Sequence, residues 1–75
     1  MSNAELARGW AVSQGGKILI DTVSISRRAA IINYLVVYMK IRVYSVLPDK
    51  DIKNLWTMRS ADVIVHEVTV EFYTP

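Results

Sequence analysis

Alternating apolar and polar positions near the start of the chain predict a β-hairpin. Strands are expected at about 9–14 and 17–23, with Gly15-Gly16 between them. A Gly-Gly pair suits a tight hairpin turn, because both central residues of that turn need a positive φ. The first third of the chain is therefore expected to be two antiparallel strands, with residues 1–8 frayed ahead of them.

The pattern changes to a helical period over residues 27–40, and Ser24 or Ser26 can cap the first turn. One apolar stripe has the spacing of a buried helix face and contains Ile31, Ile32, Leu35, Val36 and Met39. The opposite side is apolar too, and a helix that is apolar nearly all round must be buried on two sides. We expect the second side to be a protein interface formed by Ala30, Tyr34, Val37 and Tyr38.

The rest of the chain predicts one more helix and one more strand. Pro48 suits the start of a helix over about 49–59, which has acidic residues in its first turn. The pattern leaves open whether residues 41–47 are helix, strand or loop. Residues 62–73 alternate strictly, which predicts a long strand with one buried and one solvated face. The expected buried positions are Ile64, His66, Val68, Val70 and Phe72.

This succession predicts an α+β fold of ββααβ order, in which a three-stranded antiparallel sheet has both helices packed on one face. The 75 residues are expected to form one small domain, spanning 1–75. There is no cysteine for a disulfide, and the single histidine cannot organise a zinc site. Because a domain of this size has marginal stability without such cross-links, self-association is expected to compensate.

Residues with catalytic potential do not form a recognisable site. Glu67 and Glu71 would lie about 13 Å apart on an extended strand, farther than paired hydrolytic carboxylates need. His66 has neither a cysteine nor a strained serine motif to serve, so it is expected to be a core or rim histidine. No metal or cofactor motif is present, and the chain is not expected to be an enzyme.

Net charge offers a second possibility for function. The total is +2, but residues 1–47 carry +4 and residues 48–75 carry −2. The basic half could bind nucleic acid weakly, aided by stacking of Tyr34, Tyr38 and Tyr44. The opposing interpretation is that the two halves pair with each other, or that an arginine at the helix start pairs with an acid such as Asp21 or Asp62. The candidate nucleic-acid contacts are Arg27, Arg28, Lys40 and Arg42.

The longest apolar segment, residues 29–39, is too short for a membrane span, which needs about 20 residues. No secretory signal is visible, so a soluble cytoplasmic protein is expected.

Short segments of the chain resemble uncharacterised small proteins encoded by tailed bacteriophages and prophages. The resemblance covers roughly residues 9–72 and departs at the apolar run Tyr34 to Tyr38 and at His66. It implies an accessory protein in the cytoplasm of a bacterial host and supplies no activity, ligand or catalytic residue. Its motifs are Gly9-Trp10-Ala11-Val12, Ile25-Ser26-Arg27-Arg28-Ala29-Ala30-Ile31, a tryptophan in the second helix and a Val-x-Val terminal strand.

Together these observations predict a non-enzymatic protein-interaction module that forms a homodimer. Its contact would be the outer face of the first helix or an unpaired strand edge. The alternative is a weak nucleic-acid-binding accessory protein that uses the basic start of the first helix. A third possibility is a minimal enzyme around His66. The partner in the host or phage is not specified by the sequence.

Overall fold

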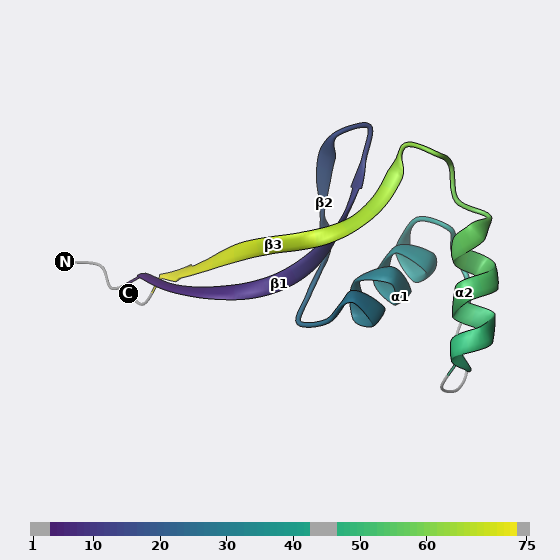
Figure 1. Cartoon of the computed structure of the whole chain (residues 1–75), viewed down its shortest axis with the longest axis horizontal. Coiled ribbons are helices and arrows are strands. Elements are labelled where there is room, and N and C mark those ends of the chain that lie inside the picture. Colours follow the sequence, from purple (N-terminus) through teal and green to yellow (C-terminus); the bar gives the residue numbers. More distant parts are fainter. Residues whose placement is uncertain (1–3, 43–46, 74–75) are drawn as a thin grey trace.

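The computed structural model describes residues 4–42 and 47–73, with side-chain surroundings for 5–42 and 47–71. It confirms the predicted α+β class and the ββααβ order (Figure 1). The bounds fall within a few residues of those expected, except at the start of the first strand and the end of the first helix. The elements are β1 (Ala4–Gln14), β2 (Lys17–Ser24), α1 (Arg27–Val37), α2 (Asp49–Thr57) and β3 (Val63–Tyr73).

The three strands form one antiparallel sheet in the order β2-β1-β3, so β1 lies in the centre. β1 and β3 pair along their whole length, from Ala4 opposite Tyr73 to Gln14 opposite Val63. The prediction that residues 1–8 are frayed is therefore wrong for residues 4–8, because the long β3 supplies them with a hydrogen-bonded partner. Figure 1 shows this outer part of the β1–β3 ribbon extending away from the helices.

The hairpin turn is formed by the two glycines, as predicted. Gly15 and Gly16 have φ values of 58° and 80°, which side-chain-bearing residues rarely adopt. The turn sets Gln14 opposite Lys17 and Ser13 opposite Ile18. It therefore fixes the register of β2 on the central strand.

A bulge interrupts the pairing of β2 with β1. Val12 pairs with Leu19 and Trp10 pairs with Ser24, so residues 20–23 of β2 lie opposite a single residue of β1. Thr22 lies inside this bulge and is completely buried. Its hydroxyl accepts the Val12 amide hydrogen at 2.8 Å and donates to the Leu19 carbonyl at 2.6 Å. One side chain thus replaces the backbone partner that the bulge takes away from the central strand.

Replacing Thr22 by valine is expected to lower the free energy of unfolding by about 1–3 kcal/mol. The shape is preserved, but the buried Val12 amide and Leu19 carbonyl lose their hydroxyl partner. Urea denaturation followed by circular dichroism measures the loss. Thr22→Ser keeps the hydroxyl and is the matched control. An equal or greater loss for the serine variant would assign the stabilisation to the methyl group instead.

α1 begins where the sequence predicts and ends earlier. Ser26 is the N-cap, with its hydroxyl accepting the Ala29 amide hydrogen at 3.1 Å. The helix was expected to continue to Lys40, but Lys40 has a φ of 55°, and the Ile41 amide donates to the Leu35 carbonyl at 2.9 Å. Such a left-handed residue followed by a closing bond is a common helix end. Ile41 can then turn back against the core.

Lys40→Gly is expected to raise the free energy of unfolding by about 0.5–1 kcal/mol, because lysine is strained at a left-handed φ and glycine is not. Thermal or urea unfolding measures the gain. Lys40→Ala removes the same charge but retains a Cβ, so it should give no gain. Equal stabilisation by both variants would show that charge, not backbone strain, is the cause.

The core lies between one face of the sheet and the helices. Within the described residues, α1 contacts all three strands, whereas α2 packs against α1 and not directly against a strand, so the prediction that both helices pack on the sheet holds for α1 only. α2 begins after Pro48 with acidic Asp49 and Asp51 in its first turn, as predicted. The buried cluster comprises Val12, Ala30, Ile31, Tyr34, Leu35, Ile52, Trp56 and Val63.

The face of β3 that points to the helices is not the predicted one. Val63 is completely buried and Val65 packs against the core, whereas Ile64 is 52% exposed. The strict alternation of β3 is present, but its orientation is set by pairing with β1, which places Val65 opposite the core residue Val12. The continuous apolar side of β3 therefore points away from both helices.

The connection between the helices resolves only part of the open question about residues 41–47. Ile41, Arg42 and Leu47 belong to neither helix nor strand. Residues 43–46, which include the stacking candidate Tyr44, lie outside the described residues, as do the side-chain surroundings of Phe72.

Candidate interaction surfaces

One face of the sheet has no helix over it, and this face is almost free of charge. The register and the alternation place it on the side of Ser13, opposite the side of Val12. Among the described side chains of β1 and β3, its only acidic or basic residue apart from His66 is Glu5, near the end of the ribbon. Arg8, Glu67 and Glu71 all fall on the helix side. Besides Glu5, the uncovered face comprises Ala7, Gly9, Ala11, Ser13, Ile18, Ile64, His66, Val68 and Val70.

Larger side chains from the flanking strands form the outer surface of this uncovered face. The central strand contributes only small residues, and Ala11 and Ser13 are 0% and 4% exposed. A methyl group added at Gly9 would lie 3.5 Å from Val70 Cγ2, so Val70 leans over the central strand. Ile18 and Ile64 remain about half exposed. In an ordinary antiparallel sheet such a solvent-facing side is polar.

Ser13 and His66 form a hydrogen-bonded pair within the uncovered face. Ser13 Oγ lies 2.5 Å from His66 Nε2, and His66 Nδ1 lies 3.1 Å from the Glu67 carbonyl oxygen. A carbonyl only accepts, so Nδ1 is the donor in that contact, and in the neutral ring Nε2 accepts from the serine hydroxyl. The alternation of residues 62–73 places His66 on the apolar face, but no sequence pattern associates it with Ser13. Ser13 lies in β1 and His66 in β3, and only the register between these two strands brings the side chains together.

The distance from Ser13 Oγ to His66 Nε2 is one at which a nucleophile contacts its general base. The surroundings of the pair differ from those of an acyl-transfer site. Ser13 Oγ is almost completely covered, and Ser13 lies in the central strand with partners in both neighbouring strands. Its neighbouring backbone amides are thus engaged in the sheet rather than directed at a reacting oxygen, as an oxyanion hole requires. Within the sheet, each of these two side chains provides a hydrogen-bond partner for the other.

The predicted interface on the first helix is largely inside the protein. Ala30 and Tyr34 are buried in the core. The Tyr34 ring meets the edge of the Trp56 ring at a centroid distance of 5.7 Å. The second apolar side of α1 is covered in part by α2 of the same chain, whose Trp56 contacts Tyr34. Ala30 and Tyr34 therefore cannot contact a partner without unfolding, which corrects the predicted surface.

Val37 and Tyr38, the other two predicted interface residues, are about 40–50% exposed beside β2. The Tyr38 hydroxyl donates to Asp21 Oδ2 at 3.3 Å. Desolvation raises the pKa of the Tyr38 hydroxyl, and the negative charge of Asp21 raises it further. Tyr38 is therefore a neutral hydrogen-bond donor at pH 7, and its ring stacks on Tyr34 at 5.4 Å between centroids.

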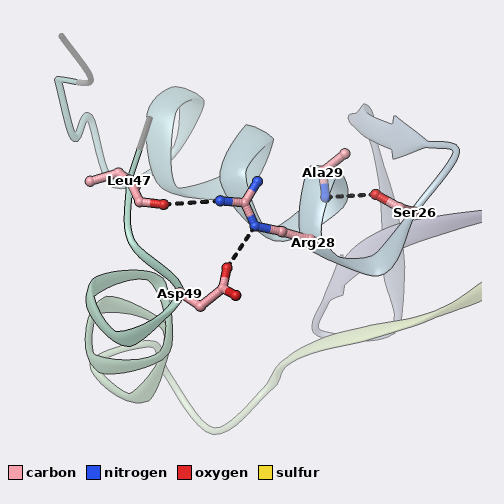
Figure 2. Close-up of polar contacts among 5 residues, drawn as sticks. All are labelled: Ser26, Arg28, Ala29, Leu47 and Asp49. Atoms are coloured by element: carbon pink, nitrogen blue, oxygen red, sulfur yellow. Dashed lines mark hydrogen bonds and ion pairs between the residues drawn. The ribbon is translucent and has the colours of Figure 1, made fainter. Parts of the chain in front are cut away.

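The four candidate nucleic-acid contacts do not lie together. Arg28 is held by the residues around the start of α2: its Nε donates to Asp49 Oδ1 and its Nη2 to the Leu47 carbonyl, both at 2.9 Å (Figure 2). The prediction that an arginine here pairs with an acid is confirmed, although the acid is Asp49. Arg27 is exposed at the same end of α1, whereas Lys40 and Arg42 follow its other end, about 16 Å away.

A groove of about 520 Å³ runs between the first turns of α1 and the length of α2. Ile31, Ile52 and Trp56 form its floor, and the cross-link from Arg28 to Asp49 closes one side. Arg27 and Lys53 line the groove from different helices, and neither has an acidic partner in the described part of the chain. The lining residues are Arg27, Arg28, Ile31, Asp49, Ile52, Lys53, Trp56 and Thr57.

Neither a metal cluster nor a membrane-spanning helix occurs among residues 4–42 and 47–73. Within these ranges no three acidic or histidine side chains are close enough to hold a metal ion. No helix there is long and apolar enough to cross a membrane. Comparison with protein-family models, with curated proteins and with solved structures found no match.

Proposed function

We propose that this protein is a non-enzymatic interaction module that self-associates through the uncovered face of its sheet. The observation that carries the proposal is the distribution of charge between the two faces of β1 and β3. The solvent-facing side holds Ile64, Val68 and Val70, whereas Glu67 and Glu71 lie on the helix side. Removing an apolar surface of this kind from water lowers the free energy, which favours association through it.

The chemistry of the face suits burial against another protein surface. A buried polar group costs free energy only when it lacks a partner. The polar side chains of this face near the hairpin, Ser13 and His66, already hydrogen-bond to each other. Covering the face would therefore leave no unpaired side-chain group there.

A second copy of the chain is the occupant we favour. In a twofold dimer the same patch meets itself, so a charged patch would place like charges together, and this face avoids that cost. Two sheets packed face to face also form a common type of core. The chain has 75 residues and no disulfide, and a second layer on its sheet would enlarge a small core.

Nucleic-acid binding and a role in bacteriophage biology stay predictions. The separation of Lys40 and Arg42 from Arg27, together with the engagement of Arg28, does not favour a continuous phosphate-binding surface. The phage role rests on the short sequence motifs alone.

Sedimentation velocity over a series of protein concentrations tests the proposal, first for the protein alone and then with mixed-sequence duplex and single-stranded DNA. We expect a monomer–dimer equilibrium that DNA leaves unchanged. A monomer at every concentration would contradict self-association. Co-sedimentation with DNA at low salt that is lost at moderate salt would favour the nucleic-acid alternative.

A further inference from the structure

We infer that the groove between α1 and α2 binds an acidic amphipathic helix of a partner protein. The groove residues lie on the two helices, on the opposite side of the sheet from the uncovered face. The inference does not depend on self-association, because the groove belongs to a single chain. A dimer formed through the sheet would leave both grooves open.

The shape of the groove favours a helix. It is an open channel between two helices, and its floor is aliphatic and aromatic. A helix lying in such a channel inserts apolar side chains at i, i+3, i+4 and i+7. α2, which lines the groove from Asp49 to Thr57, is 9 residues long, or about 13 Å, so between two and three turns of a partner helix fit along it.

The charge of the groove favours an acidic partner. The lining includes three cations and one acid, and the acid Asp49 is already paired with Arg28. This leaves Arg27 on one helix and Lys53 on the other to meet acidic side chains that flank the apolar stripe of a partner helix. Charge complementarity of this kind selects the partner and its orientation.

Trp56 makes the same groove a poor place for nucleobases. Its side chain is 7% exposed, the Arg59 guanidinium lies 4.4 Å from the ring centroid, and Tyr34 meets it edge to face. A base needs a free aromatic face for stacking. Aliphatic side chains need only the edge of the ring together with Ile31 and Ile52.

A titration followed by amide chemical shifts tests the inference on the full chain. The probe is a synthetic three-turn peptide with leucine at i, i+3, i+4 and i+7 and glutamate elsewhere. We expect shifts concentrated on α1 and α2 around Ile31, Ile52 and the Trp56 indole. A peptide with glutamine in place of glutamate should bind about tenfold more weakly.

Matched variants locate the charges. Lys53→Gln should weaken binding of the acidic peptide about threefold to fivefold, and Arg27→Gln with Lys53→Gln about tenfold. Lys50→Gln removes the same charge from an exposed residue of α2 outside the groove, so it should leave the affinity unchanged.

Three outcomes would overturn the inference: no shifts in the groove at millimolar peptide, equal binding of the glutamine peptide, or shifts confined to β1 and β3. Stronger shifts in the groove with single-stranded DNA than with the acidic peptide would also overturn it, in favour of nucleic acid. Repeating the titration with the sheet-face variant Val68→Glu separates this result from self-association, since that variant keeps the groove residues.

Discussion

Val68→Glu is expected to convert the proposed sheet-face dimer into a monomer without unfolding the chain. Val68 lies within the uncovered face, opposite Gly9, and is only partly buried in the single chain. A glutamate there is accommodated in water, but in a dimer two carboxylates would be buried at a twofold interface without partners. Because such burial costs several kcal/mol per charge, the dimer should weaken by about two orders of magnitude or more.

Thr69→Glu is the matched control, since Thr69 is the next residue of β3 and its side chain is exposed on the opposite face. It adds the same charge one residue away and should leave the dimer intact. Sedimentation velocity gives the association state, and circular dichroism verifies that both variants are folded. A dimer unaffected by Val68→Glu, or lost equally with Thr69→Glu, would exclude the uncovered face as the interface.

Trp56→Ala is expected to have the largest effect on stability. Ile52 and Trp56 are the buried residues of α2, and the Trp56 ring packs against Tyr34 on one side and Arg59 on another. Removing it should cost about 3–5 kcal/mol. A chain of this length has a total stability of about 4–11 kcal/mol, so the variant should approach unfolding at room temperature.

Urea denaturation measures this loss, and amide spectra at zero denaturant show whether α2 alone or the whole chain opens. Met58→Ala is the control, because Met58 immediately follows α2 and is 71% exposed. Its effect should stay within about 0.5 kcal/mol. A loss below 1 kcal/mol for Trp56→Ala would mean that α2 does not contribute to the core as its contacts indicate.

Local signals in the sequence predict the elements well. The two glycines define the hairpin, the serine before Arg27 caps α1, and Pro48 precedes α2. Each acts through hydrogen bonds or φ restrictions among near neighbours. The end of α1 was missed because Lys40 adopts a left-handed φ without being glycine or asparagine. The hydrogen bond from the Ile41 amide to the Leu35 carbonyl stabilises this helix end, and no local sequence pattern predicts that bond.

Non-local packing explains the remaining differences. The alternation of β3 is visible in the sequence, but which side meets the helices depends on its register against β1. Likewise, the second apolar side of α1 was assigned to a partner, whereas Trp56 of α2 covers Tyr34 on that side. In the antiparallel register of β1 and β3, Arg8, Glu67 and Glu71 all lie on one face of the sheet. Comparing the charged positions of both strands therefore shows that the opposite face carries little charge.

An isotope-filtered NOE experiment tests the central claim most directly. Equal amounts of labelled and unlabelled chain are mixed, so that only contacts between two copies give cross-peaks. We predict intermolecular contacts among the methyl groups of Ile18, Ile64, Val68 and Val70, the apolar residues that form the uncovered face. Intermolecular contacts confined to α1 and α2, or none at concentrations where the protein sediments as a dimer, would contradict association through the sheet.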